Sequence, residues 1–475
     1  MSLGMPVVRR PRRQHGPTRQ DCRVASFEAA VAAGDAERVK DLASRLRAIV
    51  RDQRREPTME PGETAGMAVS PGSTDLDAQA AIAAALGGAV VAAPEGRHDS
   101  ACLVIDRDYD DARYHGRRQV DACRVSPQAP VALFEPRLAA VSDWARRMVF
   151  FDIETTGLSG GAGTVAFLVG CGWFEAEAFR VRQWLMTGPA GERVLLDALA
   201  RTFDDASLLV TFNGRTFDVP FMEMRWAFHR QGSPVEELPH FDMLPAARRL
   251  WSRREDDTSC SLTALERSVL GFHRVGDVPG FEIPARYFHF LRTGDPAVIE
   301  GVLEHNRLDL VSLAAVTAHA LRMAEDGPQW CREPSEQLGL GHFYERQGDF
   351  ERALDAYALA GAADDRDLRG RALERQALLL RRQQRFDEAA ATWLRLVEGA
   401  ARPFSGIERR AAEALAIHHE HRAGDLGEAR RYAEVVRGQV TGRHVAGVEH
   451  RLGRLARKQE KQKGDPLVAP LLDSD

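Results

Sequence analysis

The sequence predicts an α/β domain followed by an all-α domain of helical repeats. Between residues 146 and 325, apolar runs of strand length are interspersed with segments of helical periodicity, which is typical of an α/β domain. From residue 333 to 456 the composition changes to Ala, Leu, Arg and Glu, and one motif appears three times. A chain of 475 residues is long enough to give each domain its own core.

The first 145 residues are predicted to form a polar arm and a small β-containing segment. Residues 1–83 start with five arginines and no acid in the first twenty positions, a composition that does not repay the entropy cost of folding. We therefore expect a disordered arm with one helix, over residues 36–51, where apolar side chains recur at helical spacing. Residues 84–145 alternate apolar runs with turn residues, and we expect them to pack on the α/β domain.

Within the α/β domain, four strands and a first helix are predicted. The strands are expected at 148–153, 166–174, 179–185 and 207–212, and the helix at 192–201. Further helices are expected from there to the end of the domain.

The repeated motif begins at Gly348, Gln384 and Gly424, and its third residue is Phe350, Phe386 or Leu426. These third residues are 36 (350 to 386) and 40 (386 to 426) positions apart, close to the ~34 residues of a tetratricopeptide repeat. The region is predicted to form stacked helical hairpins, whose surfaces commonly bind a protein partner. Residues 457–475 form a charged tail.

Bulk properties favour a cytoplasmic protein. The six cysteines are scattered and form no CxxC pair, which fits free thiols in a reducing compartment. No apolar run reaches the ~18 residues of a membrane span, so no membrane contact is expected. The net charge of -5 argues against a globally basic nucleic-acid coat protein but leaves room for a locally basic groove.

An acidic pair lies inside the first apolar strand. Asp152 and Glu154 are two positions apart and so project from one face of that strand. Burying two like charges without a cation is costly, so a bound metal ion is the functional interpretation. The structural alternative is an edge strand whose acids face water.

Further acids follow at the ends of other elements. Asp218 stands at the start of a predicted helix, where ordinary N-terminal capping is the structural alternative. His305 and Asp309 are four positions apart on one helix face, where they could simply pair at a surface. Functionally, Asp309 would bind metal and His305, whose ordinary pKa is about 6.5, would take the proton from an attacking water. Asp242 fits either support of a metal centre or a plain helix N-cap.

Taken together, these segments resemble the DEDD exonucleases of the ribonuclease H-like superfamily, and most of all their YprB-like branch. The matching motifs are Phe151-Asp-Ile-Glu-Thr-Thr-Gly-Leu158, Phe212-Asn-Gly-Arg-Thr-Phe-Asp218 and His305-Asn-Arg-Leu-Asp309. The resemblance covers roughly residues 85–325 and continues into the repeats. It implies a mixed sheet flanked by helices and two Mg²⁺ or Mn²⁺ ions held by Asp152, Glu154, Asp218 and Asp309.

The implied activity is stepwise release of nucleotides from the 3′ end of single-stranded DNA or RNA. One departure from the family pattern concerns the proton acceptor. The family places a Tyr four residues, or a His five residues, before the last Asp, whereas here His305 stands at the four-residue spacing. Two other functions stay open: an endonuclease on the same metal site, and a nucleic-acid-binding scaffold that recruits partners through its repeats.

Overall fold

The computed structural model describes residues 76–93, 101–157, 163–251, 260–398, 400–439 and 443–463. The expected arginine-rich start and the helix expected over residues 36–51 lie outside these ranges. All described residues belong to one compact unit that spans Ala68–Asp475. Among them, no helix is both long enough and apolar enough to cross a membrane.

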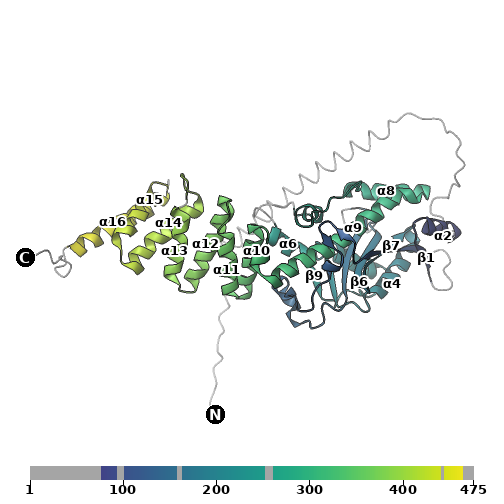
Figure 1. Ribbon diagram of the computed structural model, residues 1–475. Coiled ribbons are helices and arrows are strands. Elements are labelled where there is room, and N and C mark those ends of the chain that lie inside the picture. The colour runs from purple at the N-terminus through teal and green to yellow at the C-terminus, as the bar shows by residue number, and fades with distance from the viewer. Residues whose placement is uncertain are drawn as a thin grey trace, which may run out of the picture. The chain divides into compact units, whose positions relative to one another are not determined.

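A mixed sheet of seven strands organises the first part of the chain (Figure 1). Its strand order is β1-β2-β7-β6-β5-β8-β9. The strands are β1 (Ala89–Ala92), β2 (Ala101–Asp110), β5 (Met148–Thr155), β6 (Ala166–Glu175), β7 (Ala178–Met186), β8 (Leu208–Thr211) and β9 (His240–Asp242). Neighbours from β1 to β5 pair antiparallel, whereas β8 and β9 continue from β5 in parallel. Strands β1 and β2 therefore extend the same sheet that holds the acidic pair.

Helices cover both faces of this sheet. They are α2 (Leu76–Ala85), α4 (Glu192–Phe203), α5 (Asp218–Phe228), α6 (Met243–Trp251), α7 (Leu262–Leu265), α8 (Ile283–Thr293) and α9 (Pro296–Asp326). A π-helical turn, η5 (Glu266–Leu270), follows α7 directly. The segment between β2 and β5 adds the small hairpin β3 (Tyr114–His115) and β4 (Arg118–Gln119), the turns η2 (Asp121–Cys123) and η3 (Pro136–Ala140), and α3 (Val131–Phe134).

Side chains alternate between the two faces of β5, and this alternation explains which helix lies next to the acids. Phe151 points to one face, where its ring lies 5.9 Å from the ring of Phe203 in α4. Phe150 points to the other face and shares a buried cluster with Leu310 of α9. Because side chains two apart share a face, Asp152 and Glu154 project toward α9.

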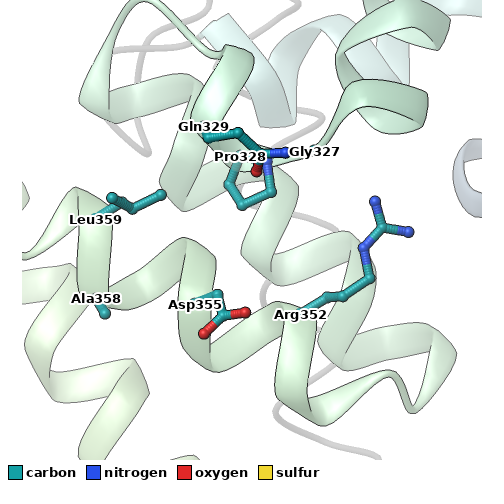
Figure 2. A pocket seen from close by; sticks show the side chains of 7 residues that line it. All are labelled: Gly327, Pro328, Gln329, Arg352, Asp355, Ala358 and Leu359. Carbon is teal, nitrogen blue, oxygen red and sulfur yellow. The ribbon is translucent and has the colours of Figure 1, made fainter.

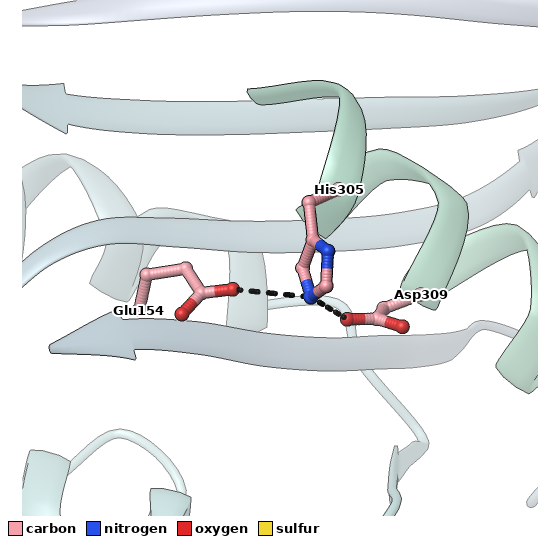
Figure 3. A group of neighbouring side chains, drawn as sticks. All are labelled: Glu154, His305 and Asp309. Atoms are coloured by element: carbon pink, nitrogen blue, oxygen red, sulfur yellow. Dashed lines mark ion pairs between the residues drawn. The ribbon is translucent and has the colours of Figure 1, made fainter. Parts of the chain in front are cut away.

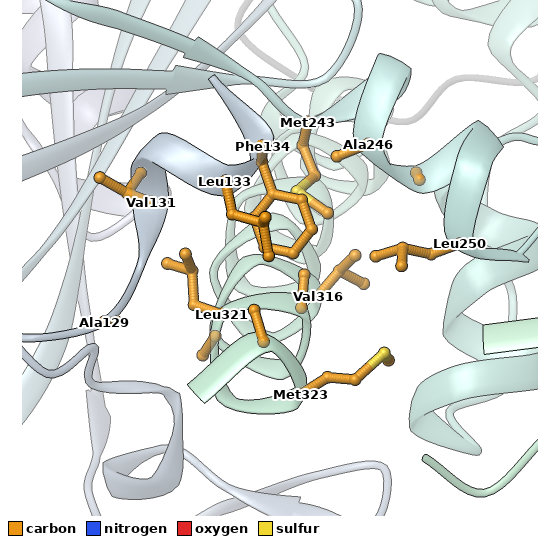
Figure 4. Packing of buried hydrophobic residues seen from close by; sticks show 14 of the residues in the cluster. Ala129, Val131, Leu133, Phe134, Met243, Ala246, Leu250, Val316, Leu321 and Met323 are labelled. Carbon is orange, nitrogen blue, oxygen red and sulfur yellow. The ribbon is translucent and has the colours of Figure 1, made fainter. Parts of the chain in front are cut away.

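The cluster on the α9 face continues beyond the sheet. It joins residues of α3, α6 and α9, and Figure 4 shows Phe134, Met243 and Val316 meeting there. The same cluster includes Leu338, Phe343 and other residues of the helical region that follows. Fully buried apolar side chains of this kind contribute about 1.5–3 kcal/mol each, so this packing fixes α9 against the sheet.

The rest of the described chain is all helix. The helices are α10 (Pro334–Gln347), α11 (Phe350–Ala360), α12 (Arg366–Arg382), α13 (Phe386–Glu398), α14 (Gly406–His418), α15 (Leu426–Arg437) and α16 (Arg443–Lys463), with the turns η7 (Pro328–Trp330) and η8 (His419–Ala423). Helix α16 continues to Lys463, into the charged segment 457–475. The structure thus confirms the fold class, an α/β unit with a mixed sheet followed by packed helix pairs.

The repeated sequence motif coincides with the turn inside each helix pair. Its first residue has a positive φ: +84° at Gly348, +64° at Gln384 and +71° at Gly424. A residue in the left-handed conformation ends a helix, and glycine adopts this conformation without strain. The next helix then starts, capped by Asp349 or Asp425 in the first and third copies. The motif is therefore a helix stop followed directly by a helix start.

Candidate metal centre

Three elements bring the predicted acids together. Asp152 and Glu154 come from β5, Asp218 is the first residue of α5, and Asp309 lies on α9. One ligand atom each from Glu154, His305 and Asp309 lie within 4.8 Å of one another. Asp152 and Asp218 both lie close enough to Asp309 for its charge to raise their pKa values. All five residues singled out in the sequence thus converge on one place.

His305 and Asp309 face the sheet because they are one helical turn apart on α9 (Figure 3). The Nε2 atom of His305 lies 3.4 Å from Oδ2 of Asp309 and 3.9 Å from Oε1 of Glu154. The side chains of these three residues are 16–18% exposed, so solvent and small ligands can reach them. The His305–Asp309 pair faces the acids rather than standing alone at a surface.

Asn306 anchors α9 to the acidic strand. Its side chain is completely buried, and its Nδ2 donates a hydrogen bond of 2.7 Å to Oδ2 of Asp152. Its Oδ1 accepts one of 2.7 Å from Nε2 of Gln183 in β7. With both amide atoms satisfied, Asn306 fixes the register of α9 on the sheet and leaves the other Asp152 oxygen for a ligand.

Asp218 is held in place by a turn that Asp242 organises. The carboxylate of Asp242 accepts hydrogen bonds from the backbone N–H groups of Asn213 (2.8 Å), Arg215 (3.2 Å) and Leu244 (3.1 Å). Asn213 adopts a φ of +72°, which the turn before α5 requires. Asp242 therefore supports the loop that carries Asp218 and also caps the start of α6.

Three of these acids, Asp152, Glu154 and Asp218, have raised pKa values. Burial, reinforced by the charges of Asp309 and Asp218, raises the pKa of Glu154 to about 8. Burial, with Asp242 and Asp309 nearby, raises the pKa of Asp218 to about 7, against hydrogen bonds from backbone groups at Asp218 and Ile153. Burial and three neighbouring acids also raise the pKa of Asp152 well above its usual range. Crowded carboxylates of this kind are stabilised by a divalent cation, which takes their oxygen atoms as ligands.

Two further residues contact the centre from the loop between η5 and α8. Arg274, whose side chain is only 4% exposed, donates to Oδ1 of Asp309 at 2.5 Å and to both oxygens of Glu266 at 2.6 and 2.8 Å. Asp277 lies with Oδ1 2.7 Å from Nδ1 of His305. Sequence reasoning missed both, because a lone Arg and Asp in a glycine-containing loop carry no spacing signal. Their role depends on where the loop folds.

The chain has the fold and the clustered acids of a ribonuclease H-like protein. A family model described as the RNase_H superfamily matches residues 149–321, a range that contains all five predicted site residues. The chain is also 32% identical over 290 residues to the uncharacterized protein YprB of Bacillus subtilis (strain 168). That alignment covers 60% of this chain and 68% of YprB. The chain therefore belongs to the YprB family.

Among solved structures, the chain is similar to the family B DNA polymerase from the hyperthermophilic archaeon Pyrobaculum calidifontis. The TM-score is 0.30 and the sequence identity is 14%. The match covers 45% of this chain and 29% of the polymerase, so the chain spans less than a third of that protein.

Proposed function

We propose that this protein is a metal-dependent 3′-to-5′ exonuclease of the DEDD type that acts on single-stranded DNA or RNA, with residues 146–325 as its catalytic domain. The observation that carries the proposal is the convergence of four carboxylates and His305 from three separate elements on one partly exposed centre. Structural ion pairs alone do not account for it, because Asp152 and Asp218 take part in none of the ion pairs of the described residues, and Glu154 has only its 3.9 Å contact with His305.

The donor set fits two hard divalent cations. Asp152, Glu154, Asp218 and Asp309 offer carboxylate oxygens, which Mg²⁺ and Mn²⁺ prefer. Bound cations would neutralise the scissile phosphate and stabilise the leaving oxygen. The protein's own contribution is to hold the acids rigidly: Asn306 fixes Asp152, the Asp242-bound turn places Asp218, and Arg274 fixes Asp309.

His305 supplies the proton acceptor in this proposal. Its Nε2 is directed toward the acids of β5 and α9, and an imidazole has an ordinary pKa suited to taking a proton from water near neutral pH. The four-residue spacing to Asp309 keeps both side chains on one face of α9.

The test is a time course on 5′-labelled single-stranded DNA and RNA with Mg²⁺ or Mn²⁺. We expect a ladder that shortens from the 3′ end, disappears with chelator, and slows more than about 100-fold in Asp152→Asn. Asp204→Asn is the matched control, since it removes an exposed acid at the end of α4 and should leave the rate unchanged. Scattered internal cuts would identify an endonuclease, and intact substrate that is nevertheless bound would identify a scaffold.

For the helical region, we propose a tetratricopeptide-like platform for a protein partner. Two adjoining surface pockets support this, one of about 420 Å³ between Gly327–Gln329 and α11 (Figure 2) and one of about 360 Å³ that reaches α13. They share Asp355 and Ala358, and Leu359 beside them is 42% exposed. Leu359→Glu should weaken binding of a purified partner, whereas Leu378→Glu on α12, where Leu378 is 37% exposed, should not. Equal effects of both would refute this pocket as the binding surface.

A further inference from the structure

We infer that Asp277 is the positioning residue that sets the orientation and tautomer of His305, an inference that rests on the proposed nuclease function. The contact is short: Oδ1 of Asp277 lies 2.7 Å from Nδ1 of His305. The same oxygen accepts the backbone N–H of Val278 at 3.0 Å. The carboxylate is therefore fixed by its own backbone before it meets the imidazole ring.

The chemistry of the pair determines which ring nitrogen is free. An ionised carboxylate only accepts hydrogen bonds, so Nδ1 of His305 must carry the proton when it meets Asp277. In neutral imidazole the other nitrogen, Nε2, is then an acceptor. That nitrogen is the one directed toward Glu154 and Asp309, at 3.9 and 3.4 Å. The lone pair of Nε2 therefore points between two carboxylates, where it can accept a proton from a water molecule.

Arg274 is the competing contact. Its Nη1 lies 3.4 Å from Nδ1 of His305, and donation from it would demand the opposite tautomer, with the proton on Nε2. The distance favours Asp277, and Arg274 has stronger partners in Glu266 and Asp309 at 2.5–2.6 Å. Its Nη1 also lies 3.3 Å from Oδ2 of Asp277. Arg274 thus holds Asp277 and Asp309 together, and both side chains of the α9 pair are oriented from one loop.

The loop that carries Asp277 also packs directly against α9. Val278 packs on the backbone of α9 at Gly301, one turn before His305, where a Cβ atom would lie 2.9 Å from the Val278 side chain. Val278 is 2% exposed. The peptide that carries Asp277 is therefore docked against the helix that carries His305, as a support for a rigid catalytic group requires.

The decisive experiment compares Asp277→Ala, Asp277→Asn and His305→Ala with the double variant Asp277→Ala/His305→Ala in the full-length protein. We expect Asp277→Ala to lower kcat by roughly 10- to 100-fold with KM and Mn²⁺ affinity changed by less than about threefold. Asp277→Asn, which keeps an acceptor oxygen, should recover part of the loss. The double variant should be no slower than His305→Ala alone. Glu282→Gln, on the same loop but paired outward with Arg286, is the matched control and should leave kcat unchanged.

A second readout does not depend on activity. Long-range ¹H–¹⁵N spectra of ¹⁵N-histidine-labelled protein report which ring nitrogen carries the proton, and His305→Gln assigns the signal. We expect a protonated Nδ1 in the wild type and a mixture of tautomers in Asp277→Ala. An unchanged tautomer in Asp277→Ala, or losses that multiply in the double variant, would overturn the inference. If the wild type degrades no nucleic acid, the proposed function fails while the spectra still decide the Asp277–His305 relationship.

Discussion

Gly170 of β6 and Asn306 of α9 touch so closely that a Cβ atom on Gly170 would lie 2.2 Å from Oδ1 of Asn306. That oxygen already accepts a hydrogen bond from Gln183, and the side-chain nitrogen of Asn306 donates one to Asp152. The absence of a side chain at Gly170 therefore lets α9 approach the sheet and place His305 and Asp309 against β5.

Gly170→Ala should push α9 away from the sheet. We expect a loss of about 1–3 kcal/mol in unfolding free energy, because an added methyl group in a packed core forces its neighbours to move. Activity should fall by up to about 100-fold, since a shift of about 1 Å misplaces the reacting groups. Denaturant unfolding and initial rates measure both. Gly447→Ala in α16, where a Cβ meets nothing within 4 Å, should instead stabilise the protein slightly.

The metal-free protein should become less stable as the pH rises. Glu154 and Asp218 have folded-state pKa values near 8 and 7, above their unfolded values of about 4. Their contribution to stability is therefore full below about pH 4 and is lost as the pH rises through the folded values. The melting temperature in chelator should be lower at about pH 8.5 than at about pH 6, and added Mg²⁺ or Mn²⁺ should raise it most at the higher pH.

The matched variant for that experiment is Glu154→Gln/Asp218→Asn. Neutral amides remove the two titrations, so the fall in melting temperature with pH should shrink and the stabilisation by metal should be lost. A wild type and double variant with the same pH dependence would show that these two acids do not titrate as described.

Glu192→Gln should destabilise the link between α4 and α5. Glu192 accepts hydrogen bonds of 2.5 Å from Nε and Nη2 of Arg225, and its Oε2 lies 2.8 Å from Nε2 of His229. The side chains of Glu192 and Arg225 are only 7% and 4% exposed. Removing the carboxylate charge leaves Arg225 buried without a counterion, at a cost of about 3–5 kcal/mol. Asp326→Asn, which breaks an ion pair to a 63% exposed Arg322, should cost less than about 1 kcal/mol. Comparable losses in the two variants would contradict this view.

Glu336 should contribute stability that acid removes. Burial would raise its pKa, but hydrogen bonding with His319, Trp251 and two backbone N–H groups lowers it to about 2. A lowered folded-state pKa gives stability that is present above the unfolded value of about 4.3 and is lost as the pH falls toward 2. The gap in unfolding free energy between wild type and Glu336→Gln, about 1–3 kcal/mol at neutral pH, should close in that window. A gap of constant size would rule out this account.

The local patterns of the sequence predict most of the fold. Strands β5, β6 and β7 appear as apolar runs because both of their faces are buried. The helix pairs appear because a residue with positive φ marks the turn inside each of three pairs, followed by a capping Asp in the first and third. The acids of β5 are also recognisable in the sequence, since charged residues are unusual inside an apolar strand. What local pattern does not contain is the pairing order of the strands, which placed β1 and β2 in the central sheet.

The sequence by itself determined the acid types, their order along the chain and the shared faces of Asp152 with Glu154 and of His305 with Asp309, because strand and helix periods are local properties. Only the tertiary structure decided that Asp277 meets His305, 28 residues away, and that Arg274 meets Asp309, 35 residues away. Such contacts depend on how the loop after η5 packs on α9. No local period records packing between segments that distant in the chain.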